Sequence, residues 1–180
     1  MADADGVKAE AEAFAKVYAA LFSSPACSSA EHVAEVASSI GKHYRPGITF
    51  FTNGGISRFD VRFHRLTAIV TADTGLQSRQ EAADLIEKEM RKAISYGIGV
   101  HLDLLEICKV EVYSQTSALC WLHWAFRPKP GSEYEGKDCT FTNIYGYRAA
   151  TAGVEAGWEF VVRDEEVNAM FKSIGKSFDD

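Results

Sequence analysis

The sequence predicts one α+β domain in which a curved antiparallel sheet wraps around helices, and three observations lead to this prediction. Apolar residues recur at spacings of three and four within residues 9–40 and again within 82–94, which is typical of amphipathic helices. Strand-like segments joined by short turn-forming stretches fill most of residues 101–163, and short connections favour antiparallel neighbours. The 180 residues, 47% of them hydrophobic, contain no evident linker or repeat, so we expect a single domain over 1–180 with its core at about 9–172.

The first two helices are predicted from an apolar stripe and from residues that begin or end a helix. The first spans residues 9–22 and ends before Pro25. The second opens with Ser28 and Glu31 at the spacing of a capping box and ends at Gly41. The apolar stripe of the first helix consists of Phe14, Val17, Tyr18, Leu21 and Phe22.

Two further helices follow by the same criteria. A longer third helix repeats the capping-box spacing at Ser78 and Glu81 and ends at Gly97. Residues 66–76 before it are expected to form a loop. Asp164 is expected to cap a last short helix. The inner side of that helix consists of Val167, Met170, Phe171 and Ile174.

The strands are expected as one early pair and four long strands. The pair spans residues 47–55 and 56–63, and the long strands span 101–114, 117–127, 137–148 and 157–163. The strand 117–127 has no polar face, since mostly apolar residues occupy both sides. A sheet with two apolar faces needs cover on both, so we expect helices on one face and a second copy of the chain on the other. A large loop folded over the outer face is the alternative.

Charge and cysteine content exclude several classes of protein. The net charge of −6 disfavours a nucleic-acid partner, because a phosphate backbone would be repelled. Acidic residues replace the basic start of a secretory signal, and no apolar run is long enough to span a membrane. The four cysteines are widely separated and form no zinc-binding or redox pair. We therefore expect a cytoplasmic protein with reduced thiols, no metal and no cofactor.

Two segments resemble strands of a known superfamily. GWEFVVRDEEV, residues 157–167, is similar to the final strand of the nuclear-transport-factor-two-like superfamily, and FTNIYGYR, residues 141–148, is similar to its penultimate strand. The order of elements over residues 9–172 agrees with the same superfamily. The resemblance implies a cone-shaped, cystatin-like α+β fold, shared with ketosteroid isomerase, scytalone dehydratase and polyketide cyclases. In that fold the concave side holds a pocket when the helices leave it unfilled, and the convex side often packs against a second subunit.

Such a cone implies an aromatic-lined cavity for a small apolar or weakly polar molecule. Tyr18 lies on the stripe of the first helix, so its hydroxyl is a candidate to point into the cavity, although an aromatic core residue is the alternative. The first strand region supplies further lining residues. The candidate ligand-binding residues are Tyr18, Phe22, Tyr44, Phe51, Asn53, His123, Asn143 and Arg148.

Three residues are candidates for acid-base chemistry: His123, Tyr18 and Glu106. His123 lies between two tryptophans, and its ordinary pKa suits proton transfer, but a histidine satisfied by a neighbour in a core or interface fits as well. Glu106 alternates with Leu104 and Val110, so burial on that face would raise its pKa. If Ile107 and its face point inward instead, Glu106 lies in water.

Two classes of function remain open on the sequence. One is a noncatalytic module that binds a small molecule or forms a homodimer through its sheet. The other is a proton-transfer enzyme such as an isomerase, dehydratase or cyclase. Residues 43–55 contain no Asp or Glu, whereas a ketosteroid-isomerase-like mechanism would need a carboxylate base there. This absence favours the noncatalytic reading.

The strand 137–148 has two different faces, and either can be the ligand side. Tyr145 belongs to a largely aromatic face that also carries Asn143. Ile144 belongs to a smaller face that carries threonines and Arg148. The aromatic face suits a large packed surface, and the threonine face suits a pocket wall or a wet rim.

Overall fold

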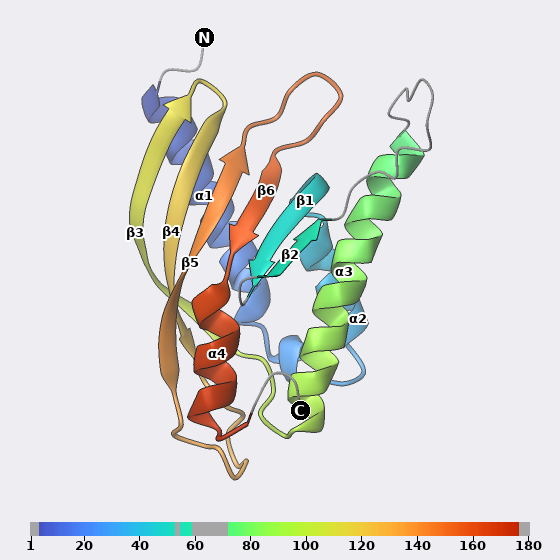
Figure 1. Ribbon diagram of the computed structural model, residues 1–180, viewed down its shortest axis with the longest axis vertical. Coiled ribbons are helices and arrows are strands. Elements are labelled where there is room, and N and C mark those ends of the chain that lie inside the picture. Colours follow the sequence, from blue (N-terminus) through green and yellow to red (C-terminus); the bar gives the residue numbers. More distant parts are fainter. Residues whose placement is uncertain (1–3, 53–54, 59–71, 177–180) are drawn as a thin grey trace.

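The computed structural model describes residues 4–52, 55–58 and 72–176, which form an α+β fold built on one curved sheet (Figure 1). The described strands lie side by side in the order β2-β1-β6-β5-β4-β3. Their bounds are β1 Tyr44–Thr52, β2 Gly55–Arg58, β3 Leu102–Ser114, β4 Ser117–Phe126, β5 Cys139–Arg148 and β6 Gly157–Val162. The predicted α+β class and curved sheet are confirmed.

One pair of strands departs from the predicted antiparallel arrangement. β1 and β6 run parallel, with Phe50 beside Val161, while the other strand pairs within the described residues are antiparallel. The backbone N–H of Trp158 donates to the His43 carbonyl at 2.8 Å and that of Arg163 to Phe51 at 2.9 Å, which fixes both ends of the pair. Short turns determine the direction of consecutive strands only, and most of the chain separates β1 from β6.

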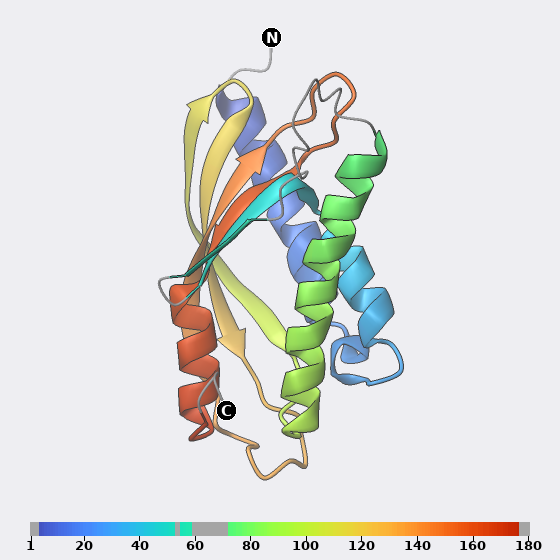
Figure 2. The same cartoon turned by 45° about the vertical axis from the view of Figure 1, so that its right-hand side comes forward.

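The helices gather on the concave side of the sheet. Figure 2 shows α1 and α3 on the same side, while α4 follows β6 and packs along β5. The helical elements are α1 Ala4–Phe22, the 3-10 helix η1 Pro25–Ser28, α2 Val33–Gly41, α3 Ala72–Ser95 and α4 Asp164–Ser173. Not one of these described helices is apolar over a length that would cross a bilayer.

Helix starts were predicted less well than helix faces. α2 begins at Val33, and its N-cap residue His32 makes no side-chain cap. Ser28 does not cap α2, because its hydroxyl accepts the backbone N–H of Val100 at 2.9 Å. α3 begins at Ala72, within the stretch expected to be a loop. On α1, Val17 was placed on the buried stripe but is 61% exposed, because the buried stripe follows Val7, Ala11, Ala15, Tyr18 and Phe22 and Val17 lies off this line.

Strand β3 resolves the open question about Glu106. Opposite β4, the register shifts between Leu104 and Glu106 and again between Ile107 and Lys109. Each β-bulge adds one unpaired residue and so exchanges the two faces of the strand. As a result Leu104 and Ile107 both pack against the core, and Glu106 is exposed.

Candidate functional site

A cavity lies between the concave side of the sheet and helices α1, α3 and α4. The centres of water molecules can occupy about 70 Å³ of it, and its whole atom-free space, including the part open to solvent, is about 740 Å³. Its lining residues come from every layer of the fold: Tyr18, Phe22, Tyr44, Phe50, Ile86, Glu89, Met90, Ala93, Val100, Leu102, Trp124, Tyr145, Val161, Arg163, Glu166, Met170 and Phe171.

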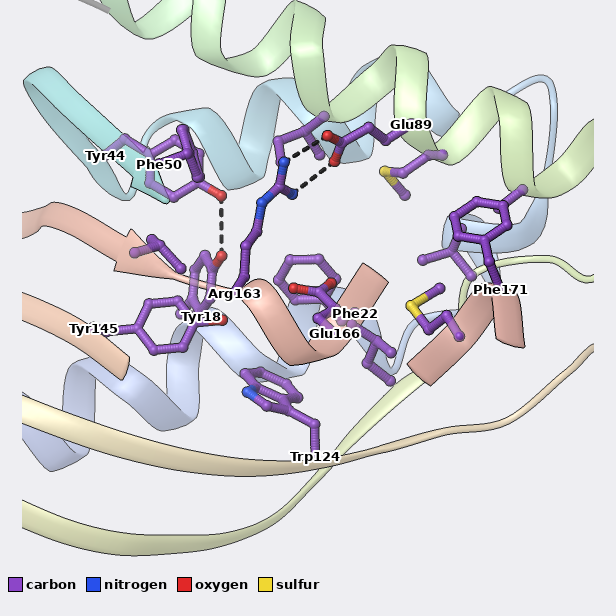
Figure 3. Close-up of a pocket in the computed structure, with 17 residues that line it drawn as sticks. Tyr18, Phe22, Tyr44, Phe50, Glu89, Trp124, Tyr145, Arg163, Glu166 and Phe171 are labelled. Carbon is purple, nitrogen blue, oxygen red and sulfur yellow. Dashed lines mark hydrogen bonds and ion pairs between the residues drawn. The ribbon is translucent and has the colours of Figure 1, made fainter. Parts of the chain in front are cut away.

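Two tyrosine hydroxyls meet on one wall of this cavity. Tyr18 of α1 and Tyr44 of β1 are both buried, and their hydroxyl oxygens lie 3.0 Å apart in a hydrogen bond (Figure 3). Tyr145 of β5 packs against Tyr18 with ring centroids 5.6 Å apart. Burial raises the pKa of all three phenols well above the ordinary value. They are therefore neutral hydrogen-bonding groups near neutral pH.

A carboxylate projects into the cavity from the first turns of α4. Figure 3 shows Glu166 between Arg163 and Trp124, with its carboxylate directed inward. The amide Nδ2 of the buried Asn143 donates to Glu166 Oε2 at 2.8 Å. Burial raises the pKa of Glu166, although the nearby Arg163 and the Asn143 hydrogen bond both act to lower it. Glu166 can therefore exchange a proton closer to neutral pH than an ordinary glutamate.

A buried ion pair forms the opposite wall. Arg163 directly follows β6 in the chain. Both terminal nitrogens of its guanidinium donate to the two carboxylate oxygens of Glu89 on α3, and the bond from Nη1 to Oε2 is 2.7 Å long. Its Nε donates to Thr52 Oγ1 at 2.9 Å, and its Cζ atom lies 5.0 Å from the centre of the Phe50 ring. Burial acts to lower the pKa of Arg163, but Glu89 more than offsets this, so the pKa is raised and the charge is retained.

Several predicted ligand-binding residues do lie at this cavity. Tyr18, Phe22 and Tyr44 line it, and Tyr18 is also the one acid-base candidate of the three that does so. Asn143 shares the inward face of β5 with Tyr145 and holds Glu166 in place. The aromatic face of β5 is thus the cavity side, and the face with threonines and Arg148 is the outer one.

The structure places the other candidates elsewhere. His123 lies on the outer face of β4, where its Nδ1 is hydrogen bonded to Thr142 Oγ1 at 3.1 Å. Phe51 alternates with the inward Phe50 and so faces outward, against Phe160. Arg148 makes two hydrogen bonds of 3.0 Å to Glu159, also on the outer face. Strand alternation therefore removes these three from the cavity. Glu106 is exposed on β3, as described above, and Asn53 lies outside the described residues.

Sequence reasoning missed three of the polar residues at the cavity, although each carried a signal. Glu89 stands on the apolar stripe of its helix, between Ile86 and Ala93. Arg163 alternates with the buried Val161, and Glu166 is one helical turn before Met170. A charged residue on an otherwise buried face is the informative exception in such patterns.

The arrangement can hold a small molecule among aromatic and aliphatic side chains and offer it hydroxyl groups and one titratable carboxylate. Among the described residues, no group of three or more His, Cys, Asp or Glu side chains is placed to hold a metal ion.

Comparison with known proteins identifies the fold. No family model and no curated protein matches the chain. A solved domain of unknown function with a cystatin-like fold from Nostoc punctiforme is similar at a TM-score of 0.54 and 12% identity, over 87% of this chain and 75% of that chain. An NTF-2-like protein of unknown function from Shewanella oneidensis is similar at a TM-score of 0.45 and 10% identity, over 73% of this chain and 89% of that chain. The protein has a cystatin-like fold, as its resemblance to nuclear-transport-factor-two-like proteins implied.

Proposed function

We propose that the protein binds a small, largely apolar molecule in the cavity between the sheet and helices α1, α3 and α4. The observation that carries this proposal is the cavity wall itself, in which rings and aliphatic groups surround a few convergent polar groups. Small-molecule sites commonly have this composition, with most of the ligand contacting apolar groups and few polar groups fixing its orientation. The Tyr18–Tyr44 hydroxyl pair and Glu166 are the groups that would orient the ligand.

Phenol and toluene form a suitable pair of probes, because they match in size and differ in one hydroxyl. We expect both to bind in calorimetric titrations, with phenol bound more tightly because its hydroxyl can bond to the polar wall. Ala93→Leu should weaken both, since Ala93 lines the cavity and extra carbons would fill it. Ala34→Leu, on an exposed position of α2, is the matched control and should change neither affinity. If neither phenol nor toluene binds to the wild-type protein, the proposal is ruled out.

Proton transfer is a second candidate function, and the position of Glu166 favours it. The carboxylate would remove a proton next to a carbonyl group, while a hydroxyl of the Tyr18–Tyr44 pair would donate to the oxygen that becomes negative. Exchange of the α-protons of cyclohexanone in D₂O, followed by NMR, tests this directly. Glu166→Gln should abolish any exchange above the background rate, and the exposed neighbour Glu165→Gln should leave it unchanged. Background exchange in the wild-type protein would leave binding as the function.

We also propose that the outer face of the sheet mediates a homodimer. Trp121, Ile144 and Val162 lie next to one another across β4, β5 and β6, and all three are only half-buried. Next to them, Leu119 of β4 pairs with Gly146 of β5, and Gly146 pairs with Phe160 of β6. Such a continuous apolar surface matches a second copy of itself.

A cytoplasmic location agrees with four cysteines that are all free thiols.

A further inference from the structure

The cavity wall carries more carboxylates than positively charged groups. Three lining residues carry a carboxylate or a guanidinium: Glu89, Arg163 and Glu166. Each of the three guanidinium nitrogens of Arg163 donates to a protein oxygen, and Glu89 takes two of these bonds. The positive charge at the cavity is therefore already neutralised by the protein.

Glu166 is in a different situation. In the part of the chain that the structure describes, its hydrogen-bond partner is the neutral amide of Asn143. When ionised, it gives the cavity wall a net formal charge of −1, since Glu89 and Arg163 cancel. The aromatic residues Phe22 and Trp124 line the same cavity as Glu166. Carboxylate and ring faces both attract a cation, and neither attracts an anion.

We propose that the ligand of this cavity carries an ammonium group, which pairs with Glu166 while its apolar body packs against the surrounding rings. This rests on the proposed binding function and names the class of ligand: a small amine with an aromatic or aliphatic body. An anionic ligand would have to displace Glu89 from Arg163 and would lie beside Glu166. A neutral ligand would leave the Glu166 carboxylate without a counter-charge or require Glu166 to take up a proton, so it should bind less tightly than an amine of the same size.

Three probes of similar size separate the possibilities: benzylamine, benzyl alcohol and benzoate, which are positive, neutral and negative at pH 7. We expect the wild-type protein to bind benzylamine most tightly and benzoate most weakly in calorimetric titrations. Glu166→Gln removes the charge and keeps an oxygen for Asn143, so it should weaken benzylamine about 10- to 100-fold, the range for loss of one charge-assisted hydrogen bond. The affinity of this variant for benzyl alcohol should stay within about twofold of the wild-type value. A substitution that merely changed the shape of the cavity would weaken both ligands.

Glu165→Gln is the matched control, because it removes the same charge from an exposed position next in sequence. It should leave all three affinities unchanged. Retention of benzyl alcohol binding by Glu166→Gln shows that its cavity is intact. The inference is overturned if benzylamine binds no more tightly than benzyl alcohol, or if Glu166→Gln does not weaken it. Failure of all three probes to bind would instead contradict the proposed binding function.

Discussion

At the scale of single residues, the Arg163–Glu89 pair explains how a guanidinium can stay charged next to the core. The side chain of Arg163 is 7% exposed and that of Glu89 is 21% exposed. Taking such charges out of water is costly, and the two together are tolerated because each satisfies the other. The pair also connects the end of β6 to the C-terminal half of α3, so it fixes one wall of the cavity.

Removal of one partner should therefore cost more than removal of both. We expect Arg163→Met to lower the free energy of unfolding by about 3 kcal/mol, because it leaves the Glu89 carboxylate without its partner. Glu89→Gln should also be strongly destabilising, since it leaves the Arg163 charge buried. The double variant should lose less than either single variant, and so less than the sum of the two. Urea unfolding of the four proteins measures this cycle, and additive losses would show that the two side chains do not interact.

Glu166 should make stability depend on pH in the opposite direction to an ordinary paired carboxylate. Burial raises its pKa in the folded protein, with Arg163 and Glu89 as the charged groups nearby, while the unfolded chain has the ordinary value of about 4.3. Between these two values the folded protein holds a proton that the unfolded chain has lost. The free energy of unfolding therefore falls as pH rises through this window, by about 1.4 kcal/mol for each unit by which the pKa is raised.

Glu166→Gln has no such proton to lose, so its stability relative to the wild-type protein should increase from pH 4 to pH 7. Urea unfolding of both proteins at several pH values tests this, with Glu165→Gln as the exposed control. A stability difference that does not change over this range would mean that the pKa of Glu166 is not raised.

At the scale of elements, the sequence predicted which segments are strands and could not predict their irregularities. Alternating or wholly apolar runs placed β3, β4, β5 and β6 within two residues of their observed bounds. In β3 one bulge after Leu104 turns Ile107 toward the core and Glu106 outward, and a second bulge after Ile107 brings Val110 back to the core side. The sequence could not show this, because a bulge depends on the register with the neighbouring strand and leaves no local pattern. In the same way, Tyr18 was identified from one helix, but its pairing with Tyr44 depends on how α1 packs against β1.

The contact between β5 and β6 requires a glycine at one position. A Cβ atom at Gly146 would overlap the ring of Phe160, which lies across β5 at that point. We expect Gly146→Ala to lower the free energy of unfolding by about 1–3 kcal/mol, the usual cost of overpacking. Combined with Phe160→Ala, the same substitution should cost much less, because the ring is no longer there. Urea unfolding gives both values, and an equal cost in the two backgrounds would assign the effect of Gly146 to its backbone.

At the scale of the whole molecule, the two proposals assign separate uses to the two faces of the sheet. The inward face carries the cavity, with Tyr145 and Trp124 in its wall. The outer face carries half-buried apolar residues such as Trp121 and Ile144. The sequence indicated that both faces need cover, and strand alternation now assigns each residue to one of them. A ligand inside and a second copy outside would then bind without competing for the same side chains.

If the outer face forms the homodimer, disruption of that face should separate the subunits and leave the cavity intact. The chain has a mass of 19.8 kDa, and we expect sedimentation velocity to give twice this value at micromolar concentration. Trp121→Glu places a charge in the middle of the apolar row and should give the monomer mass, since an unpaired charge in an interface is costly. Val17→Glu makes a similar change on α1, where the side chain is 61% exposed, and should remain dimeric. A wild-type protein that sediments as a monomer at every concentration would contradict the dimer.

Because Trp121 points away from the cavity, Trp121→Glu should still bind phenol with wild-type affinity.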